Sequence, residues 1–203
     1  MKTREMDAFM RHMDRYFGQT DCTVLHPIVD NGHHVDVLLY EPSEKYPFWK
    51  LVTMGASDYK MPKAPYTLGR FNEYIMFVDK DEDLNDREVV LWYNSKLVMI
   101  ASYAKFSRTH VTYGHSLEWE NDDPEDEMVA AFIEMPQIIS DVRILRCKMG
   151  PFKTVTCLQT VLLNKNELGK LMETGPRAFS DYLYPEDEGK QHFISERHRS
   201  DRF

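Results

Sequence analysis

Residues 34–59, HVDVLLYEPSEKYPFWKLVTMGASDY, decide the fold class of this chain. Two runs within them, 34–40 and 48–54, are rich in β-branched and aromatic residues and have the length of β-strands. Proline residues bracket the connection between the runs, as is typical of a loop. The second run ends in GASDY, residues 55–59, a peptide that fits either a nucleophile-bearing turn or an ordinary strand exit.

The rest of the chain continues this pattern of strands with few helices between them. The strand-like runs are 23–29, 34–40, 48–54, 71–78, 128–135 and 152–163, and the helical patterns are 4–17, a longer one that begins at Asp86, 167–172 and 176–183. Asn31-Gly32 predicts a hairpin between the first two strands. The last strand-like run is apolar over such a length that it predicts a central strand covered on both faces.

This arrangement favours an α+β fold, with a largely antiparallel or mixed β-sheet packed with helices. We expect a single domain over residues 1–203. Its core spans about 20–184, an N-terminal helix occupies 1–18, and a polar tail, 185–203, is either loose or in need of a partner.

Composition indicates a globular protein of a reducing compartment. The 203 residues are 42% hydrophobic and 12% aromatic, which is enough for a sizeable core. No apolar run approaches the roughly 20 residues that span a bilayer, and the N-terminus lacks the apolar core of a signal peptide. Cys22, Cys147 and Cys157 have no CxxC spacing and do not suggest a disulfide framework. We therefore expect a cytoplasmic protein that does not contact a membrane.

The formal charge of −8 is concentrated in one acidic segment, residues 118–127, EWENDDPEDE. The candidate partner-binding residues are those of this segment: Glu118, Trp119, Glu120, Asp122, Asp123, Glu125, Asp126 and Glu127. Concentrated negative charge repels nucleic acid and attracts a basic protein, so we expect a protein partner and no direct nucleic-acid binding. Trp119 has a side chain of the type that anchors interfaces. The alternatives are a solvated loop and a tryptophan that closes the core behind it.

Motifs of known catalytic chemistry are weak or broken. Ser57 lacks the second glycine of the GxSxG nucleophile elbow, and Ser102 matches SxxK with Lys105 but without the companion motifs. The run that begins at Asp79 resembles a calcium loop but has no glycine at the sixth position. No P-loop, dinucleotide fingerprint or zinc-type spacing occurs. We predict no catalytic residue and no cofactor.

Histidines raise the question of a metal site. His33, His34 and Asp36 lie within four residues, and His110 and His115 are further imidazoles. Alternation along a strand would send His34 and Asp36 to one face and His33 to the other. A polar strand edge with ordinary loop histidines is therefore favoured, and no metal is predicted.

Four blocks of the sequence, taken together, resemble the suppressor-of-fused domain family in its compact bacterial form. The blocks are HVDVLLYEP, WKLVTMGASDYKMP, the YGHS stretch at 113–116 and GPFKTVTCLQTVLLNKNELGKL, all within residues 31–184. The family-signature residues that the resemblance implies are Asp36, Tyr40, Trp49, Gly55, Ser57, Asp58, Gly114, His115 and Gln159. Tyr113 departs from the pattern, since many relatives have tryptophan there. The resemblance implies a binding fold without a catalytic centre, in which GASDY is a signature at a strand exit.

Three functional hypotheses follow. Bacterial members of the family are associated with toxin systems, so the first is an immunity protein or antitoxin that neutralises a cognate toxin, such as a basic nuclease. Animal members restrain a transcription factor by wrapping one of its peptides, so the second is a regulatory scaffold that sequesters a host peptide by strand addition. The third, a hydrolase that uses Ser57 or Ser102 with His115, predicts hydrolysis that is lost when the serine is replaced.

Overall fold

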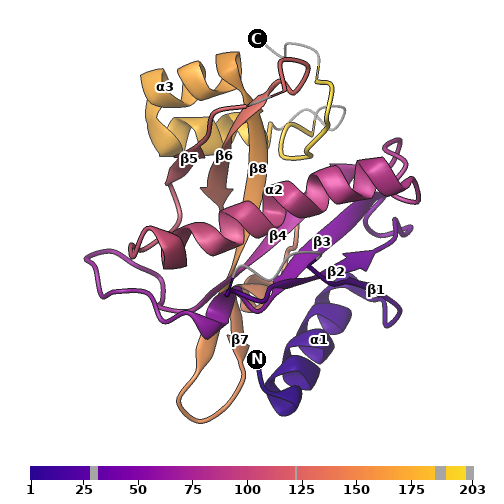
Figure 1. The fold of residues 1–203 in the computed structure, drawn as a ribbon, viewed down its shortest axis with the longest axis vertical. Coiled ribbons are helices and arrows are strands. Elements are labelled where there is room, and N and C mark those ends of the chain that lie inside the picture. Colours follow the sequence, from indigo (N-terminus) through magenta and orange to yellow (C-terminus); the bar gives the residue numbers. More distant parts are fainter. Residues whose placement is uncertain (28–31, 122, 186–190, 200–203) are drawn as a thin grey trace.

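The computed structural model describes residues 1–27, 32–121, 123–185 and 191–199, and Figure 1 shows a twisted sheet flanked by helices. Within these ranges the strands are β1 (Thr23–Leu25), β2 (Asp36–Tyr40), β3 (Phe48–Met54), β4 (Asn72–Asp79), β5 (Ser116–Glu118), β6 (Met128–Glu134), β7 (Arg146–Lys148) and β8 (Thr154–Asn164). The helices are α1 (Thr3–Phe17), α2 (Arg87–Phe106) and α3 (Lys165–Leu183), with 3-10 turns η1 (Ala56–Asp58) and η2 (Val142–Leu145). The predicted α+β class is confirmed.

The sheet is mixed, and β8 is its central strand. The order is β1-β2-β3-β4-β8-β6-β5, and β7 also pairs with β8. β1 to β4 form an antiparallel meander, whereas β4 and β8 run parallel, with Asn72 opposite Thr156. Because β8 has a partner on each edge and is buried from residue 155 to 164, the prediction of a covered central strand is confirmed.

Each face of the sheet has its own hydrophobic core, because strand side chains alternate between the two faces. On one face, Val37 and Leu51 of the meander and Leu158 of β8 pack under Tyr93 and Leu97 of α2. In Figure 1 this helix crosses the front of the sheet. The side of α2 that faces the sheet is buried, whereas its apolar residues Met99, Tyr103 and Phe106 are exposed.

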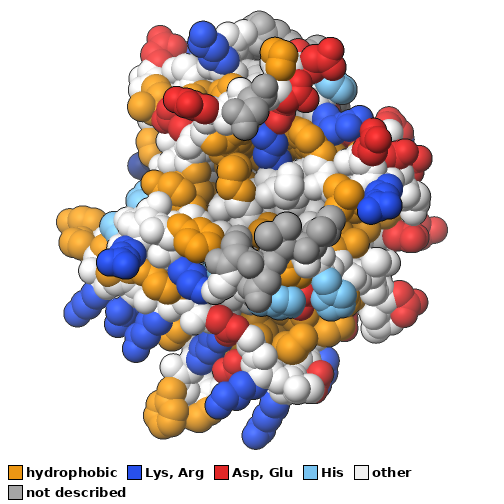
Figure 2. Space-filling view, viewed as in Figure 1, with side chains coloured by type: hydrophobic (Ala, Val, Ile, Leu, Met, Phe, Trp, Pro, Cys, Tyr) orange, Lys and Arg blue, Asp and Glu red, His pale blue; other side chains and the backbone are white. Residues whose placement is uncertain are grey.

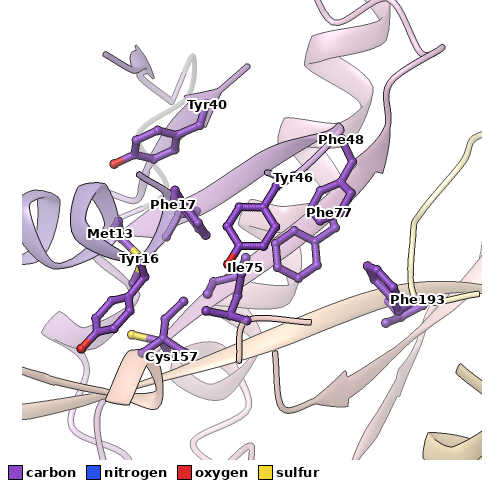
Figure 3. Packing of buried hydrophobic residues seen from close by; sticks show 14 of the residues in the cluster. Met13, Tyr16, Phe17, Tyr40, Tyr46, Phe48, Ile75, Phe77, Cys157 and Phe193 are labelled. Atoms are coloured by element: carbon purple, nitrogen blue, oxygen red, sulfur yellow. The ribbon is translucent and has the colours of Figure 1, made fainter. Parts of the chain in front are cut away.

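The opposite core lies under α1, α3 and the C-terminal tail and is rich in aromatic residues (Figure 3). The rings of Phe48 and Phe77 have centroids 5.0 Å apart, and Phe193 of the tail contacts both rings edge-on. Phe17 of α1 meets Tyr40 of β2 in the same way, with centroids 5.1 Å apart. Such pairs add to the free energy that apolar burial contributes.

Local sequence signals define the helix ends. The Asp86 side chain caps α2 by accepting hydrogen bonds from two backbone N–H groups of the first turn. Helix α1 ends at Gly18, whose backbone has left-handed dihedral angles. Asn164 and Glu167 form a capping box at the start of α3. Gly175, with φ +81°, divides α3 into two helical stretches, which matches the two short helices predicted there. None of the described helices is long and apolar enough to cross a membrane.

Two short strands and one connection differ from the sequence-based expectation. β5 and β7 have only three residues each, too few for an alternation pattern to reveal them. β1 ends at Leu25 and β2 begins at Asp36, so the pair is antiparallel as predicted but its connection is longer than a two-residue hairpin. The predicted turn residue Asn31 lies outside the described residues.

The C-terminal tail finds its partner within the chain. Ser195 forms a parallel bridge with Val78, and its backbone N–H donates to the Phe77 carbonyl at 2.8 Å. Phe193 and Ile194 are buried in the core under α1 and α3. The described part of the tail is therefore not loose, because it packs against the sheet of its own chain.

Lys50 offers a test of electrostatics in this core. Its residue is fully buried, its ammonium donates to the Glu41 carbonyl at 2.5 Å, and burial lowers the pKa of Lys50 to about 8. Below pH 8 the folded protein must therefore hold a buried charge, and this penalty disappears above the unfolded pKa. We expect Lys50→Met to raise the free energy of unfolding at pH 7 by about 1–3 kcal/mol.

Urea unfolding of both proteins at pH 7 and pH 10 checks this expectation. The advantage of Lys50→Met should shrink as pH rises from 8 towards 10.5, because the wild-type amine becomes neutral in the folded and then in the unfolded state. Lys45→Met, at an exposed lysine nearby, is the control. An equal gain at both pH values would show that packing, and not charge, is responsible.

Candidate functional site

The GASDY corner after β3 binds a buried carboxylate. The backbone N–H groups of Gly55 and Ser57 donate to Glu73 Oε1 at 2.9 and 3.0 Å, and that of Ala56 donates to Oε2 at 3.2 Å. The Thr53 hydroxyl donates to Oε2 at 2.6 Å. Burial raises the pKa of Glu73, and the hydrogen bonds from Thr53, Gly55 and Ser57 oppose the rise. The corner is therefore a joint between β3 and β4.

Gly55 is required at this corner for a steric reason. Its φ is +135°, and a Cβ atom placed on it would lie 2.4 Å from the backbone oxygen of His34. Residues with a Cβ atom are strained at such a φ. The atom that this Cβ would meet belongs to the backbone of His34 and cannot rotate away as a side chain could. The strand exit can thus turn sharply enough to present three successive N–H groups to one carboxylate.

The serines considered for catalysis are buried. Ser57 has no exposed surface, and Ser102 is 3% exposed on α2. Lys105, the partner of Ser102 in the SxxK pattern, donates its ammonium to the Gly32 carbonyl at 2.5 Å. Both serine hydroxyl oxygens are buried, and Ser102 is among the residues that line an apolar groove of about 590 Å³ along α2.

Other signature residues fasten different pairs of elements. The Tyr40 hydroxyl donates to Asp14 of α1 at 2.9 Å, which joins β2 to that helix. Trp49 Nε1 donates to the Glu82 carbonyl at 3.0 Å, which joins β3 to the turn before α2. These contacts give the side chains a role in holding the scaffold.

Gln159 in β8 connects the central strand to the tail. Its amide donates to the Phe193 carbonyl at 3.2 Å, and its oxygen accepts from the Tyr184 hydroxyl at 2.6 Å. Asp58, at the end of GASDY, pairs with Lys153 at 3.3 Å near the start of β8. Both residues again join separate segments of the chain.

Gly114 and His115 lie beside the end of β6. The N–H of Gly114 donates to the Ile133 carbonyl, and the Ile133 N–H donates to the His115 carbonyl, both at 2.8 Å. The imidazole of His115 lies beside that of His110, with centroids 5.3 Å apart, and burial lowers the pKa of His115. The backbone contacts fit the structural role that the sequence favours for this residue.

The acidic segment follows β5, the strand at one end of the sheet. Glu118, Glu120, Asp123, Glu125 and Glu127 are exposed, and Asp122 lies outside the described residues. The register with β6 points the backbone N–H and C=O groups of Ser116 and Glu118 away from that strand. Among the described residues, exposed carboxylates therefore occur beside an end strand of the sheet whose backbone groups at Ser116 and Glu118 face away from β6.

Asp126 and Trp119 anchor this segment instead of projecting from it. Asp126 pairs with Lys96 of α2 at 2.6 Å, and both side chains are largely buried. The indole N–H of Trp119 donates to the Met128 carbonyl at 2.8 Å, and its ring packs against the core under α2. Lys96 Nζ also lies 5.0 Å from the centre of this ring. This arrangement fits the alternative in which the tryptophan closes the core.

A basic groove lies on another part of the molecule, and sequence reasoning missed it. Its cavity of about 700 Å³ is lined by Arg11, Arg15, Arg143, Arg146 and Lys148 together with uncharged residues of α1, η2 and β7. Figure 2 shows basic side chains mainly in the lower half of the view and acidic ones mainly in the upper half. The basic residues of the groove come from two segments that are distant in the sequence, 8–16 and 142–148, so neither the net charge nor a local charge cluster reveals the groove.

Comparisons with known proteins agree with the fold. The family model of the suppressor of fused protein (SUFU) matches residues 31–198. The structure of the Sufu-Fu complex contains a chain with 14% identity and a TM-score of 0.66, and the match covers 97% of this chain and 91% of that one. A SUFU homologue from Neisseria gonorrhoeae FA 1090 has 10% identity and a TM-score of 0.66, with 96% and 94% coverage.

Drosophila Suppressor of Fused has 15% identity and a TM-score of 0.67. The match covers 97% of this chain but 51% of the Drosophila chain, so this chain spans about half of that relative. Comparison with curated protein sequences found no match. The family match extends over most of the sequence, and this chain therefore belongs to the suppressor of fused protein family.

Proposed function

We propose that this chain is a non-catalytic protein-binding domain that acts as an immunity protein or antitoxin by neutralising a cognate bacterial toxin. Family membership supports a binding role, since one relative of this fold was solved in a Sufu-Fu complex. The observation that carries the proposal is the set of exposed carboxylates beside the open edge of β5. A cytoplasmic location is part of the proposal and fits the three free cysteines.

The anchoring of the acidic segment favours binding over a merely solvated loop. The ion pair between Asp126 and Lys96 fixes its base, and Asn121 donates to the carbonyls of Asp126 and Met128 at 2.6 and 3.0 Å. Residues that are already held in place, such as Asn121 and Asp126, lose less conformational entropy when a partner binds. Its exposed carboxylates would complement a basic active site, such as the phosphate-binding surface of a nuclease, and would speed association.

Affinity capture of the tagged full chain from its native host tests the proposal. Capture at low salt should recover one basic protein in stoichiometric amount, and high salt should release it. Purified partner must then show a toxic activity that this chain inhibits. A captured protein without such activity, or without inhibition, would contradict the immunity role.

Charge reversal tests the proposed binding surface. Glu118, Glu120, Glu125 and Glu127 are exposed, and their replacement by lysine leaves the Asp126 to Lys96 anchor in place. We expect the association rate with the captured partner to fall about 10-fold or more at low salt, because electrostatic steering toward this surface is lost. Surface plasmon resonance over a range of salt concentrations measures the effect.

A matched variant separates local charge from net charge. Asp7, Glu44, Glu173 and Asp181 are exposed carboxylates outside the acidic segment, and changing all four to lysine alters the net charge by the same amount. This control should slow association by less than the first variant. An equal decrease of the association rate in both variants would show that only net charge matters. An unchanged association rate in the variant of the acidic segment would exclude this segment as the binding surface.

The second candidate function is sequestration of a regulatory peptide by strand addition. The specific observation in its favour is that β1 and β5 are the end strands of the sheet, and β5 directs the backbone groups of Ser116 and Glu118 outward. Backbone hydrogen bonds respond less to salt than charge pairs do. A captured partner that binds through a short linear segment and resists high salt would therefore favour this function over toxin neutralisation.

A further inference from the structure

Two histidines and a buried aspartate meet at the start of β2. Leu25 of β1 lies opposite Val37 of β2, and continuing this antiparallel register places His26 opposite Asp36. His34 precedes Asp36 by two residues, which puts both side chains on one side of the chain. His33 points elsewhere and has its ring beside that of Phe106, with centroids 6.4 Å apart. The sequence thus named two members of this group, and His26 was the one that it missed.

The three candidate ligand atoms lie close together, with the aspartate within hydrogen-bond distance of both imidazoles. Asp36 Oδ1 lies 2.8 Å from His26 Nδ1 and 3.0 Å from His34 Nε2, and the three atoms lie within 4.8 Å of one another. A tetrahedral cation with bonds of about 2.0–2.1 Å needs ligand atoms about 3.3 Å apart. The two imidazole nitrogens, which lie within 4.8 Å of each other, would have to approach by up to about 1.5 Å, and rotation of their two exposed side chains allows this.

Burial and charge also favour a cation here. The Asp36 side chain is 7% exposed, whereas those of His26 and His34 are 71% and 63% exposed. A nearly buried carboxylate is thus flanked by two imidazoles that solvent can reach. Two imidazoles and one carboxylate form a donor set suited to zinc and to neighbouring divalent transition metals, and a hard cation such as magnesium prefers oxygen ligands. Figure 2 shows histidine side chains, in pale blue, gathered at the surface below the centre of the view.

We propose that His26, His34 and Asp36 bind a divalent transition-metal cation of the zinc type. Three protein ligands leave at least one coordination position for water or for a side chain of a binding partner. The cation would fasten the segment after β1 to β2 at the edge of the sheet, where β1 contributes only three residues. Because it would bind the folded chain in preference to the unfolded one, it would also stabilise the fold.

Titration of the full chain, without a polyhistidine tag, tests this proposal. Calorimetry with Zn²⁺ at pH 7.5 should show one tight site per chain, and Co²⁺ should give visible absorption bands typical of low-coordinate binding. His26→Gln and His34→Gln change exposed side chains, so both variants should fold like wild type by circular dichroism. Each should weaken Zn²⁺ binding by more than the roughly 10- to 100-fold that follows loss of an outer-shell partner.

His110→Gln is the matched control. His110 and His115 form another pair of neighbouring imidazoles, with ring centroids 5.3 Å apart, but they are not part of the group that includes Asp36. Zn²⁺ binding should remain within twofold of wild type in this variant. Three results would each overturn the assignment. They are the absence of a tight site in wild type, unchanged affinity in both His26→Gln and His34→Gln, and loss of Zn²⁺ binding in His110→Gln.

Discussion

Glu73→Ala is expected to lower the free energy of unfolding by about 4 kcal/mol or more. The carboxylate accepts from three backbone N–H groups of the GASDY corner and from the Thr53 hydroxyl, and its residue has no exposed surface. Removing it leaves four buried donors without an acceptor and opens a cavity, and each unsatisfied donor costs about 1–3 kcal/mol. Release of the buried carboxylate recovers part of this loss. Urea unfolding followed by circular dichroism measures the difference.

Two further variants keep this test decisive. Glu73→Gln retains the shape and one acceptor oxygen, so it should lose less than Glu73→Ala and remain measurable if the alanine variant fails to fold. Glu88→Ala removes an exposed carboxylate and should stay within about 0.5 kcal/mol of wild type. A loss below 1 kcal/mol in Glu73→Ala would mean that the corner does not depend on this carboxylate.

Arg199→Met should lower the free energy of unfolding by about 3–5 kcal/mol. The Arg199 side chain is fully buried and donates to Glu167 Oε1 at 2.7 Å, to the Leu162 carbonyl at 3.2 Å and to the Ile194 carbonyl. Glu167 is 1% exposed at its side chain and also caps α3. Without Arg199 its charge is left buried and unpaired, and the tail loses its attachment to β8 and α3.

The double variant distinguishes an unpaired charge from lost packing. Adding Glu167→Gln to Arg199→Met should restore about 1–3 kcal/mol, because a neutral side chain no longer needs a cation. Urea unfolding measures stability, and limited proteolysis should cleave the tail faster in Arg199→Met than in wild type. A tail that is cut at the wild-type rate would show that this ion pair does not hold it.

Local patterns predicted much of the fold. β3 occupies the predicted residues 48–54, and α1 and α2 begin and end within one residue of the predicted limits where these were given. The parallel neighbour of β4 was not predictable in this way, because β8 follows about 75 residues later and nothing local specifies the pairing. The fate of the tail was hidden for a similar reason, since Arg199 is polar in isolation but buried once it meets Glu167.

The candidate sites were predictable as groups of residues but not as contacts. The resemblance pointed to Gly55 and Ser57, yet it did not reveal Glu73, whose only signal was an acidic residue inside an apolar strand. The acidic segment was visible as a charge cluster, whereas the roles of Asp126 and Trp119 depend on Lys96 in a helix before it. His26 was missed because it joins its partners through strand pairing and not through proximity in sequence.

The parallel pairing of β4 with β8 also sets the time at which this protein can finish folding on the ribosome. At about 5–20 residues per second, residues 80–153 between these strands take about 4 to 15 seconds to synthesise. During that interval the nascent β1–β4 meander exposes the inner edge of β4, whose backbone groups can pair with a strand of another chain. Ribosome stalling after α2 would prolong this exposure and promote aggregation. The native sheet can therefore form only after β8 has emerged from the ribosome and the tail can close over it.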